Sequence, residues 1–163
     1  MEFRDLTAAD TLEVLRLNNA EVPKVSGLDD AALVAIVDEC SHAIGVVIGG
    51  SLSGFCITLR PGATYESLNY RWFSERYDEF EYLDRIVIGP QARGLGVGAA
   101  MYAELERRID GAVPWLLCEV NVRPRNDASL RFHDRIGFRE VGQQDTDGGT
   151  KRVSLLAKAL REG

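Results

Sequence analysis

A glycine-rich turn connects a strand-like run to a helical run just past the middle of this 163-residue chain. Residues 82–88 lead into the turn, and residues 97–109 lead out of it with apolar side chains four positions apart. The first turn of a helix has unpaired N–H groups and the positive end of the helix dipole, and glycines leave those groups accessible. The segment therefore predicts a phosphate or pyrophosphate site; the alternative is a tight connection with no ligand. It reads Gly89-Pro90-Gln91-Ala92-Arg93-Gly94-Leu95-Gly96-Val97-Gly98-Ala99.

The lysine content and the glycine spacing of this turn exclude two common nucleotide loops. No Gly-Lys-Ser or Gly-Lys-Thr follows the glycines, so the turn is not a nucleotide triphosphatase loop. The spacing Gly-x-Gly-x-Gly, this far along the chain, does not fit a dinucleotide-binding Rossmann unit. The run from Arg93 to Gly98 resembles the coenzyme A pyrophosphate loop of GCN5-related N-acetyltransferases, written Gln/Arg-x-x-Gly-x-Gly/Ala. Pro90, three residues ahead of Arg93, and the preceding strand also resemble that family.

A second motif supports the same resemblance. It is similar to the family's Asn-x-x-Ala/Ser-x-x-Phe/Leu-Tyr-x-Lys/Arg-x-Gly-Phe segment, which lies on the helix after the fifth strand. The residues are Asn126-Asp127-Ala128-Ser129-Leu130-Arg131-Phe132-His133-Asp134-Arg135-Ile136-Gly137-Phe138.

Hydrophobic periodicity and turn residues predict an α/β (α+β) fold in one domain, residues 1–163. The expected order is β-α-α-β-β-β-α-β-α-β-β, which is also the order in GCN5-related acetyltransferases. It implies a mixed, mostly antiparallel seven-stranded sheet with helices on both faces. The expected strands are 2–6, 43–48, 52–59, 80–88, 115–122, 138–144 and 151–160, and the expected helices are 7–20, 29–40, 97–109 and 126–136.

The net charge, the apolar runs and the cysteines argue against several classes of partner. The net charge of −6 argues against a nucleic-acid binder, which usually has a basic face. No apolar run approaches the about 20 residues of a membrane span, and residues 1–5 do not resemble a signal peptide. Three cysteines, Cys40, Cys56 and Cys118, have no metal-ligand spacing and indicate buried thiols in a reducing compartment. We expect a cytoplasmic protein with no metal, nucleic-acid or membrane partner; a homodimer is left open.

The segment after residue 60 has no clear period, yet it is rich in aromatic residues. Disordered segments are poor in aromatics, so we expect this one to be packed. Two interpretations stay open: a self-packing loop, or an acceptor-binding lid over residues 65–82. The expected substrate contacts are Tyr70, Trp72, Glu81 and Asp84. The aromatic residues are Tyr65, Tyr70, Trp72, Phe73, Tyr77, Phe80 and Tyr82.

The family resemblance implies direct transfer of an acetyl group from acetyl-CoA to a primary amine in a ternary complex. The acceptor would be a small molecule or the amino terminus of a peptide or protein, and the thioester would lie between the strands at 80–88 and 115–122. The alternative is a non-catalytic acyl-CoA-binding or sensor module on the same fold. The resemblance implies that coenzyme A contacts Ile86, Val87, Ile88, Arg93, Gly94, Leu95, Gly96, Val97, Gly98, Ala99, Asn126, Ser129, Phe132, His133 and Arg135.

Glu119 is the candidate general base. The run from Leu117 to Val120 resembles the Leu-Glu-Val run that supplies a glutamate base in protein N-terminal acetyltransferases of this family. The alternative is a solvent-facing carboxylate, or one paired with an arginine such as Arg85. Glu81 and Asp84 are rival bases.

His133 stands where many family members have the tyrosine that protonates the departing thiolate. An imidazolium could serve as that acid, because the reference pKa of histidine is about 6.5. The alternatives are a hydrogen bond to coenzyme A and a packing role in the helix. Cys118 points to the strand face opposite Glu119, which argues against an acyl-cysteine intermediate.

Overall fold

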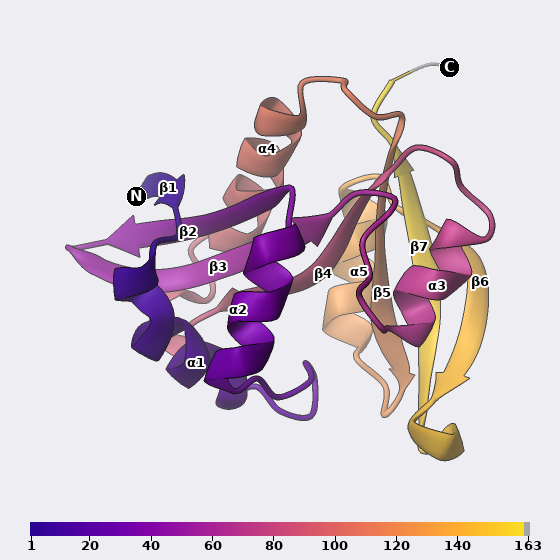
Figure 1. The fold of residues 1–163 in the computed structure, drawn as a ribbon, viewed down its shortest axis with the longest axis horizontal. Coiled ribbons are helices and arrows are strands. Elements are labelled where there is room, and N and C mark those ends of the chain that lie inside the picture. The colour runs from indigo at the N-terminus through magenta and orange to yellow at the C-terminus, as the bar shows by residue number, and fades with distance from the viewer. Residues whose placement is uncertain (162–163) are drawn as a thin grey trace. The chain divides into compact units, whose positions relative to one another are not determined.

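The computed structural model describes residues 1–161, which form seven strands and five α-helices (Figure 1). The strands are β1 (Glu2–Asp5), β2 (His42–Ile48), β3 (Ser51–Leu59), β4 (Glu81–Ile88), β5 (Trp115–Arg123), β6 (Arg139–Thr146) and β7 (Lys151–Ala159). The helices are α1 (Thr11–Asn19), α2 (Asp30–Glu39), α3 (Leu68–Ser74), α4 (Val97–Ile109) and α5 (Asp127–Arg135). Hydrogen-bonded strands follow the order β1-β2-β3-β4-β5-β7-β6. The β4–β5 pair is parallel, whereas β1–β2, β2–β3, β5–β7 and β6–β7 are antiparallel. The predicted mixed seven-stranded sheet is confirmed.

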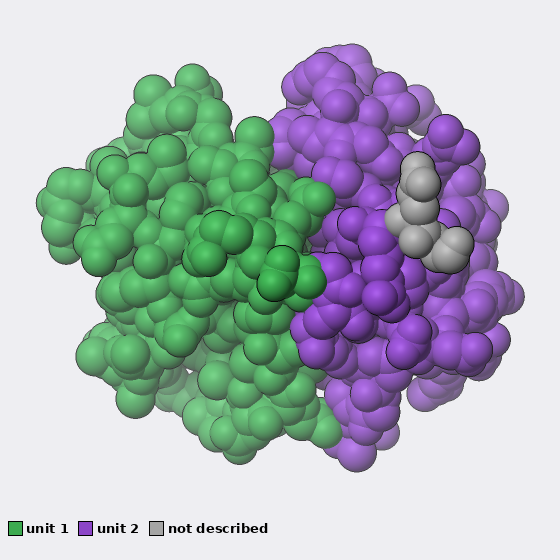
Figure 2. Space-filling view, turned by 90° about the horizontal axis from the view of Figure 1, so that it is seen from above, with its two compact units in different colours: residues 1–59, 83–110 green, residues 60–82, 111–163 purple. Residues whose placement is uncertain are grey.

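The chain divides into two compact units (Figure 2). Unit 1 contains residues 1–59 and 83–110, and unit 2 contains residues 60–82 and the chain from residue 111 onward. Strand β4 contributes residues to both units, because the division falls after Tyr82. That residues 1–163 form one domain stays a prediction.

Unit 1 carries α1 and α2 in front of β2 and β3, with α4 behind these strands (Figure 1). The apolar faces of the three helices are buried, including Leu17 of α1, Ile36 of α2 and Met101 of α4. Helix α2 begins as predicted: the carboxylate of Asp29 accepts a hydrogen bond from the Ala32 N–H at 2.8 Å. Helix α4 has the predicted bounds, so the glycine turn lies where the sequence placed it.

Unit 2 has strands β5, β7 and β6, the first residues of β4, and helices α3 and α5. Glu81 and Tyr82 of β4 pair with Leu116 and Leu117 of β5. Figure 1 shows α3 in front of β6 and β7, and a faded α5 beside β5. Among residues 1–161, no helix has the length and apolar character needed to cross a membrane.

Helix α3 is an element that the sequence analysis did not predict. It lies inside the aromatic segment that we expected to lack regular structure. The Ser67 side chain accepts a hydrogen bond from the Tyr70 N–H at 3.3 Å, which satisfies one of the unpaired donors at the helix start. Two turns of helix are too short to show a clear apolar period, so Ser67 was the available local signal.

Candidate active site

The glycine turn has the open backbone that an anion site needs. Gly94 and Gly96 both adopt φ of +76°, in the left-handed region that favours glycine. A Cβ atom added at either residue would meet nothing within 4 Å, so the space on the side-chain side of both glycines is open. The Ala100 N–H donates to the Gly96 carbonyl at 3.1 Å. The N–H groups of residues 97–99 precede that bond and are the donors that a helix start offers to an anion.

Arg93, the cation at the start of this turn, already has a carboxylate partner. Its guanidinium pairs with Glu21 and donates to the Ile88 carbonyl at 3.2 Å. The side chain of Arg93 remains 48% exposed. An incoming polyanion would therefore either share the Arg93 guanidinium with Glu21 or displace the Glu21 carboxylate from it.

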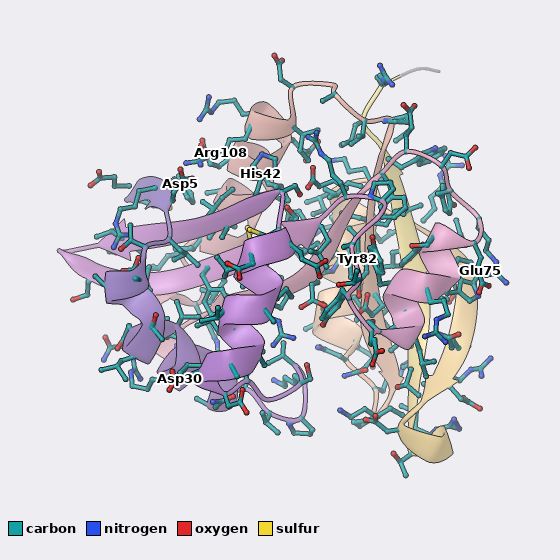
Figure 3. All side chains as sticks on the ribbon, viewed as in Figure 1. Asp5, Asp30, His42, Glu75, Tyr82 and Arg108 are labelled. Atoms are coloured by element: carbon teal, nitrogen blue, oxygen red, sulfur yellow. The ribbon has the colours of Figure 1, made fainter. Side chains whose placement is uncertain are left out.

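Glu119 lies half-buried on β5 and is hydrogen-bonded to Tyr82 of β4. The Tyr82 hydroxyl is 2.9 Å from both carboxylate oxygens. Tyr82 itself is fully buried and is labelled in Figure 3. The sequence analysis named Tyr82 only as one of the aromatic residues. No pattern within β4 or β5 indicates which side chain of β4 lies next to Glu119. A phenol hydrogen bond of this kind stabilises the ionised carboxylate that a general base requires.

The two rival carboxylates are each held by an arginine. Glu81 is fully buried and accepts a hydrogen bond from Arg60 Nε at 3.0 Å. The Asp84 side chain is 4% exposed, and its carboxylate accepts from Arg85 Nε at 2.7 Å. Each of these carboxylates is thus engaged by a charged guanidinium, whereas the Tyr82 hydroxyl that donates to Glu119 is neutral. These surroundings favour Glu119 over both rivals.

Arg85 also links β4 to helix α1 and to the connection between α1 and α2. Its guanidinium donates to the Asn18 side chain and to the Ser26 carbonyl, both at 3.0 Å. It also donates to the Ser26 hydroxyl at 3.0 Å. With the Asp84 contact, these bonds give the buried guanidinium the partners that a buried charge needs. Asp84 therefore contributes to a buried polar cluster, and its predicted contact with the acceptor stays a prediction.

His133 lies in surroundings that oppose a positive charge. Its ring packs between Phe132 and Phe138, with both centroid distances at 5.3 Å. Its Nδ1 is 2.7 Å from the Ser129 carbonyl oxygen, which can only accept, so Nδ1 carries the proton. Burial is the main cause that lowers the pKa of His133, and the hydrogen bond to Ser129 acts in the opposite direction. The acid role stays a prediction, and these contacts favour the alternative of a neutral, packed histidine.

The family's usual tyrosine provides a direct test of His133. From its contacts, we expect His133→Phe to keep most of the wild-type turnover at saturating substrates. The cost would be about 1 kcal/mol of stability from the lost hydrogen bond. Turnover numbers and thermal unfolding of both variants, His133→Phe and His133→Tyr, are the measurements. A large loss in His133→Phe that His133→Tyr restores would instead establish a proton donor at this position.

The second motif forms the start and the face of α5. The Asn126 side chain accepts from the Ser129 N–H at 3.3 Å and so caps the helix. Phe132 is half-buried and Arg135 is exposed. Contacts from Asn126, Ser129, Phe132 and Arg135 to coenzyme A stay predictions, as do those from the β4 residues 86–88.

The aromatic segment packs largely against itself. Tyr70 is 4% exposed, and its hydroxyl donates to the Arg60 carbonyl at 2.7 Å and accepts from the Ala63 N–H at 3.1 Å. Trp72 is half-buried against Gly142 of β6, where an added Cβ would lie 2.5 Å from the indole ring. These contacts favour the self-packing interpretation for Tyr70. The acceptor role of Tyr70 and Trp72 stays a prediction.

Comparison with known proteins identifies the family. Residues 12–138 match the model of the acetyltransferase (GNAT) family. The chain belongs to this family.

Individual relatives agree with that assignment. The N-alpha-acetyltransferase RimI of Mycobacterium tuberculosis (strain ATCC 25618 / H37Rv) is 31% identical over 103 residues, or 63% of this chain. The match spans 54% of that relative, about half its length. Among solved structures, Ard1 from Thermoplasma volcanium has a TM-score of 0.80 at 15% identity, covering 99% of this chain and 98% of that one. The ribosomal-protein-S18-alanine N-acetyltransferase from Escherichia coli has a TM-score of 0.75 at 15% identity, covering 99% and 95%. At these identities the two structures show a shared fold.

Proposed function

We propose that this chain is an acetyl-CoA-dependent N-acetyltransferase acting as one domain over residues 1–163. It transfers an acetyl group directly to a primary amine, of a small molecule or of a peptide or protein amino terminus, in a ternary complex. Cys56 and Cys118 are buried free thiols and Cys40 is a half-buried one, which is compatible with the cytoplasm as its compartment.

The observation that carries this proposal is the open glycine turn at the start of α4. Gly94 and Gly96 leave open space on their side-chain side, next to the N–H groups at the positive end of a 13-residue helix. Those donors suit the pyrophosphate of coenzyme A. Arg93 adds a cationic guanidinium that also forms an ion pair with Glu21.

Acetyl-CoA supplies the activated acetyl group as a thioester. Glu119 receives the proton that the acceptor amine must lose, because an ammonium has no lone pair with which to attack. The amine nitrogen then forms the new amide bond as the carbon–sulfur bond breaks. The departing thiolate takes its proton from water, or from His133 if the substitution test above establishes a donor there. Cys118 forms no acyl-enzyme in this scheme.

The acceptor class is supported by the named relative and by charge. RimI is an N-alpha-acetyltransferase, which favours an α-amino group as the acceptor. Acidic residues outnumber basic ones between residues 65 and 82, which suits a cationic amine. A small cationic amine fits the same charge, so the acceptor panel must contain both classes.

Amine-dependent release of coenzyme A tests the proposal. The purified chain is incubated with acetyl-CoA and either small amines or peptides with a free amino terminus. Peptides of the same sequence with a blocked amino terminus are the matched control. We expect release with at least one free amine and none with blocked peptides. Tight acetyl-CoA binding without amine-dependent release would instead favour the sensor alternative.

Trp72 provides a test of the acceptor side. If Trp72 lines that side, Trp72→Ala raises the Michaelis constant of the acceptor and leaves the affinity for acetyl-CoA unchanged. Tyr77→Phe is the control, because it alters another side chain of the same aromatic segment, 6.1 Å from Phe73, and keeps the ring. An equal loss for acceptor and acetyl-CoA in Trp72→Ala would show that the indole only stabilises the packing on β6.

A further inference from the structure

We propose that Tyr82 is a positioning residue for Glu119, and that helix α3 holds Tyr82 in place. The inference rests on the proposed function, in which Glu119 is the general base. It gives the aromatic segment a role in the reaction that does not require contact with the acceptor.

The strand register places the phenol at the carboxylate. Tyr82 of β4 is paired with Leu117 of β5, and Glu119 is two residues further along the same face of β5. Two residues of a strand span about 6.6 Å. A tyrosine side chain that leans along the strand covers this span, and a phenylalanine at the same position would have no donor to offer. The hydroxyl arrives at 2.9 Å from each carboxylate oxygen.

The Tyr82 ring is confined by two aromatic residues of α3. Its centroid lies 5.5 Å from that of Tyr70 and 5.8 Å from that of Phe73. All three side chains are buried. The phenol therefore approaches Glu119 from a direction fixed by packed neighbours, as a group in a close-packed interior must.

The helix that supplies these rings is itself anchored to the sheet. The Gln144 side chain of β6 donates to the Asn69 side chain at 3.0 Å, and Trp72 packs on Gly142 of the same strand. The Arg76 guanidinium lies 3.9 Å above the Trp72 ring. Asn69 and Trp72 lie in the first and second turns of α3, so both turns are held against β6. The two rings that confine Tyr82 are therefore kept in place by contacts with another strand of unit 2.

The chemical consequence is a base with a defined position. A glutamate side chain has three rotatable bonds, and a half-buried one without a fixed partner would populate several rotamers. The phenol is a donor at neutral pH, since its ordinary pKa is about 10. Its hydrogen bond to an ionised carboxylate is charge-assisted. Misplacement of a reacting group by 1 Å can cost about 10²-fold in rate, so fixing the carboxylate contributes directly to turnover.

The test is Tyr82→Phe, which removes the hydroxyl and keeps the ring. We expect the turnover number to fall by about 10- to 100-fold, in line with lost positioning of a reacting group, while the affinity for acetyl-CoA is unchanged. Tyr77→Phe is the matched control: Tyr77 belongs to the same aromatic cluster, 6.1 Å from Phe73 and 5.6 Å from Trp115. We expect Tyr77→Phe to keep the wild-type turnover.

A double-mutant cycle with Glu119→Gln separates positioning of the base from general packing. If Tyr82 acts through Glu119, adding Tyr82→Phe to Glu119→Gln lowers turnover by less than threefold. Wild-type turnover in Tyr82→Phe, or the same fold-loss in both backgrounds, would overturn the inference. Wild-type turnover in Glu119→Gln would remove the base assignment itself, and absence of amine-dependent release by the wild-type chain would remove the proposed function. Each failure is thus distinguishable from the others.

Discussion

Replacing Glu119 by glutamine is expected to lower turnover by about 10²- to 10⁴-fold, the usual contribution of a general base. Glutamine keeps the shape of the side chain and can still accept the Tyr82 hydroxyl, but it cannot take a proton at neutral pH. Most of a typical aliphatic amine is protonated at neutral pH, so removing its proton is part of the barrier. Acetyl-CoA binding should be unchanged, because the predicted pyrophosphate contacts lie on another segment.

The pH dependence distinguishes a lost base from a damaged site. In Glu119→Gln the residual turnover should recover as pH rises, because the deprotonated amine becomes abundant without help from the protein. Glu140→Gln is the matched control: Glu140 is also a strand carboxylate that accepts a hydroxyl hydrogen bond, from Ser154 at 2.6 Å. A Glu119→Gln variant that turns over like Glu140→Gln across the pH range would exclude Glu119 as the base.

The parts of the fold that the sequence predicted are those with local causes. Helix α4 has the predicted bounds because its apolar residues repeat every fourth position and a glycine precedes it. At the C-terminal end of this helix, Asp110 adopts the left-handed conformation at φ 49°, and Gly111 follows at φ 70°. Aspartate tolerates this region better than most residues, so the preceding position could turn the chain.

The parts that the sequence missed depend on tertiary neighbours. The contact between Tyr82 and Glu119 follows from the register of a parallel pair, and no pattern within either strand specifies that register. The Arg60–Glu81 pair and the burial of His133 also depend on residues from other segments, and they concern the predicted site residues Glu81 and His133. A residue type at a family position indicates a candidate, whereas its charge state depends on the groups packed around it.

The anion site at the glycine turn predicts the other large effect. Gly96→Val should weaken acetyl-CoA binding by about 10²-fold or more, because losing even one or two charge-assisted hydrogen bonds costs about 3 kcal/mol. The Cβ of residue 96 would point into space where no protein atom lies within 4 Å, so its effect on the ligand comes from blocking approach to the backbone.

Strain must be separated from blocking, because Gly96 has φ of +76° and valine adopts such an angle only at a cost. Gly50 offers the matched control: it lies in the β2–β3 turn at φ +81°, and an added Cβ there also meets nothing within 4 Å. Each substitution should cost about 1–3 kcal/mol of stability from backbone strain. Calorimetry with acetyl-CoA should then show weakened binding for Gly96→Val alone. Unchanged affinity in a folded Gly96→Val protein would place the pyrophosphate elsewhere, whereas equal losses in both variants would trace the effect to stability. Weakened binding in Gly96→Val alone would show that Gly94 and Gly96 serve the coenzyme. A turn that only reverses the chain would need their φ angles but not the absence of a side chain.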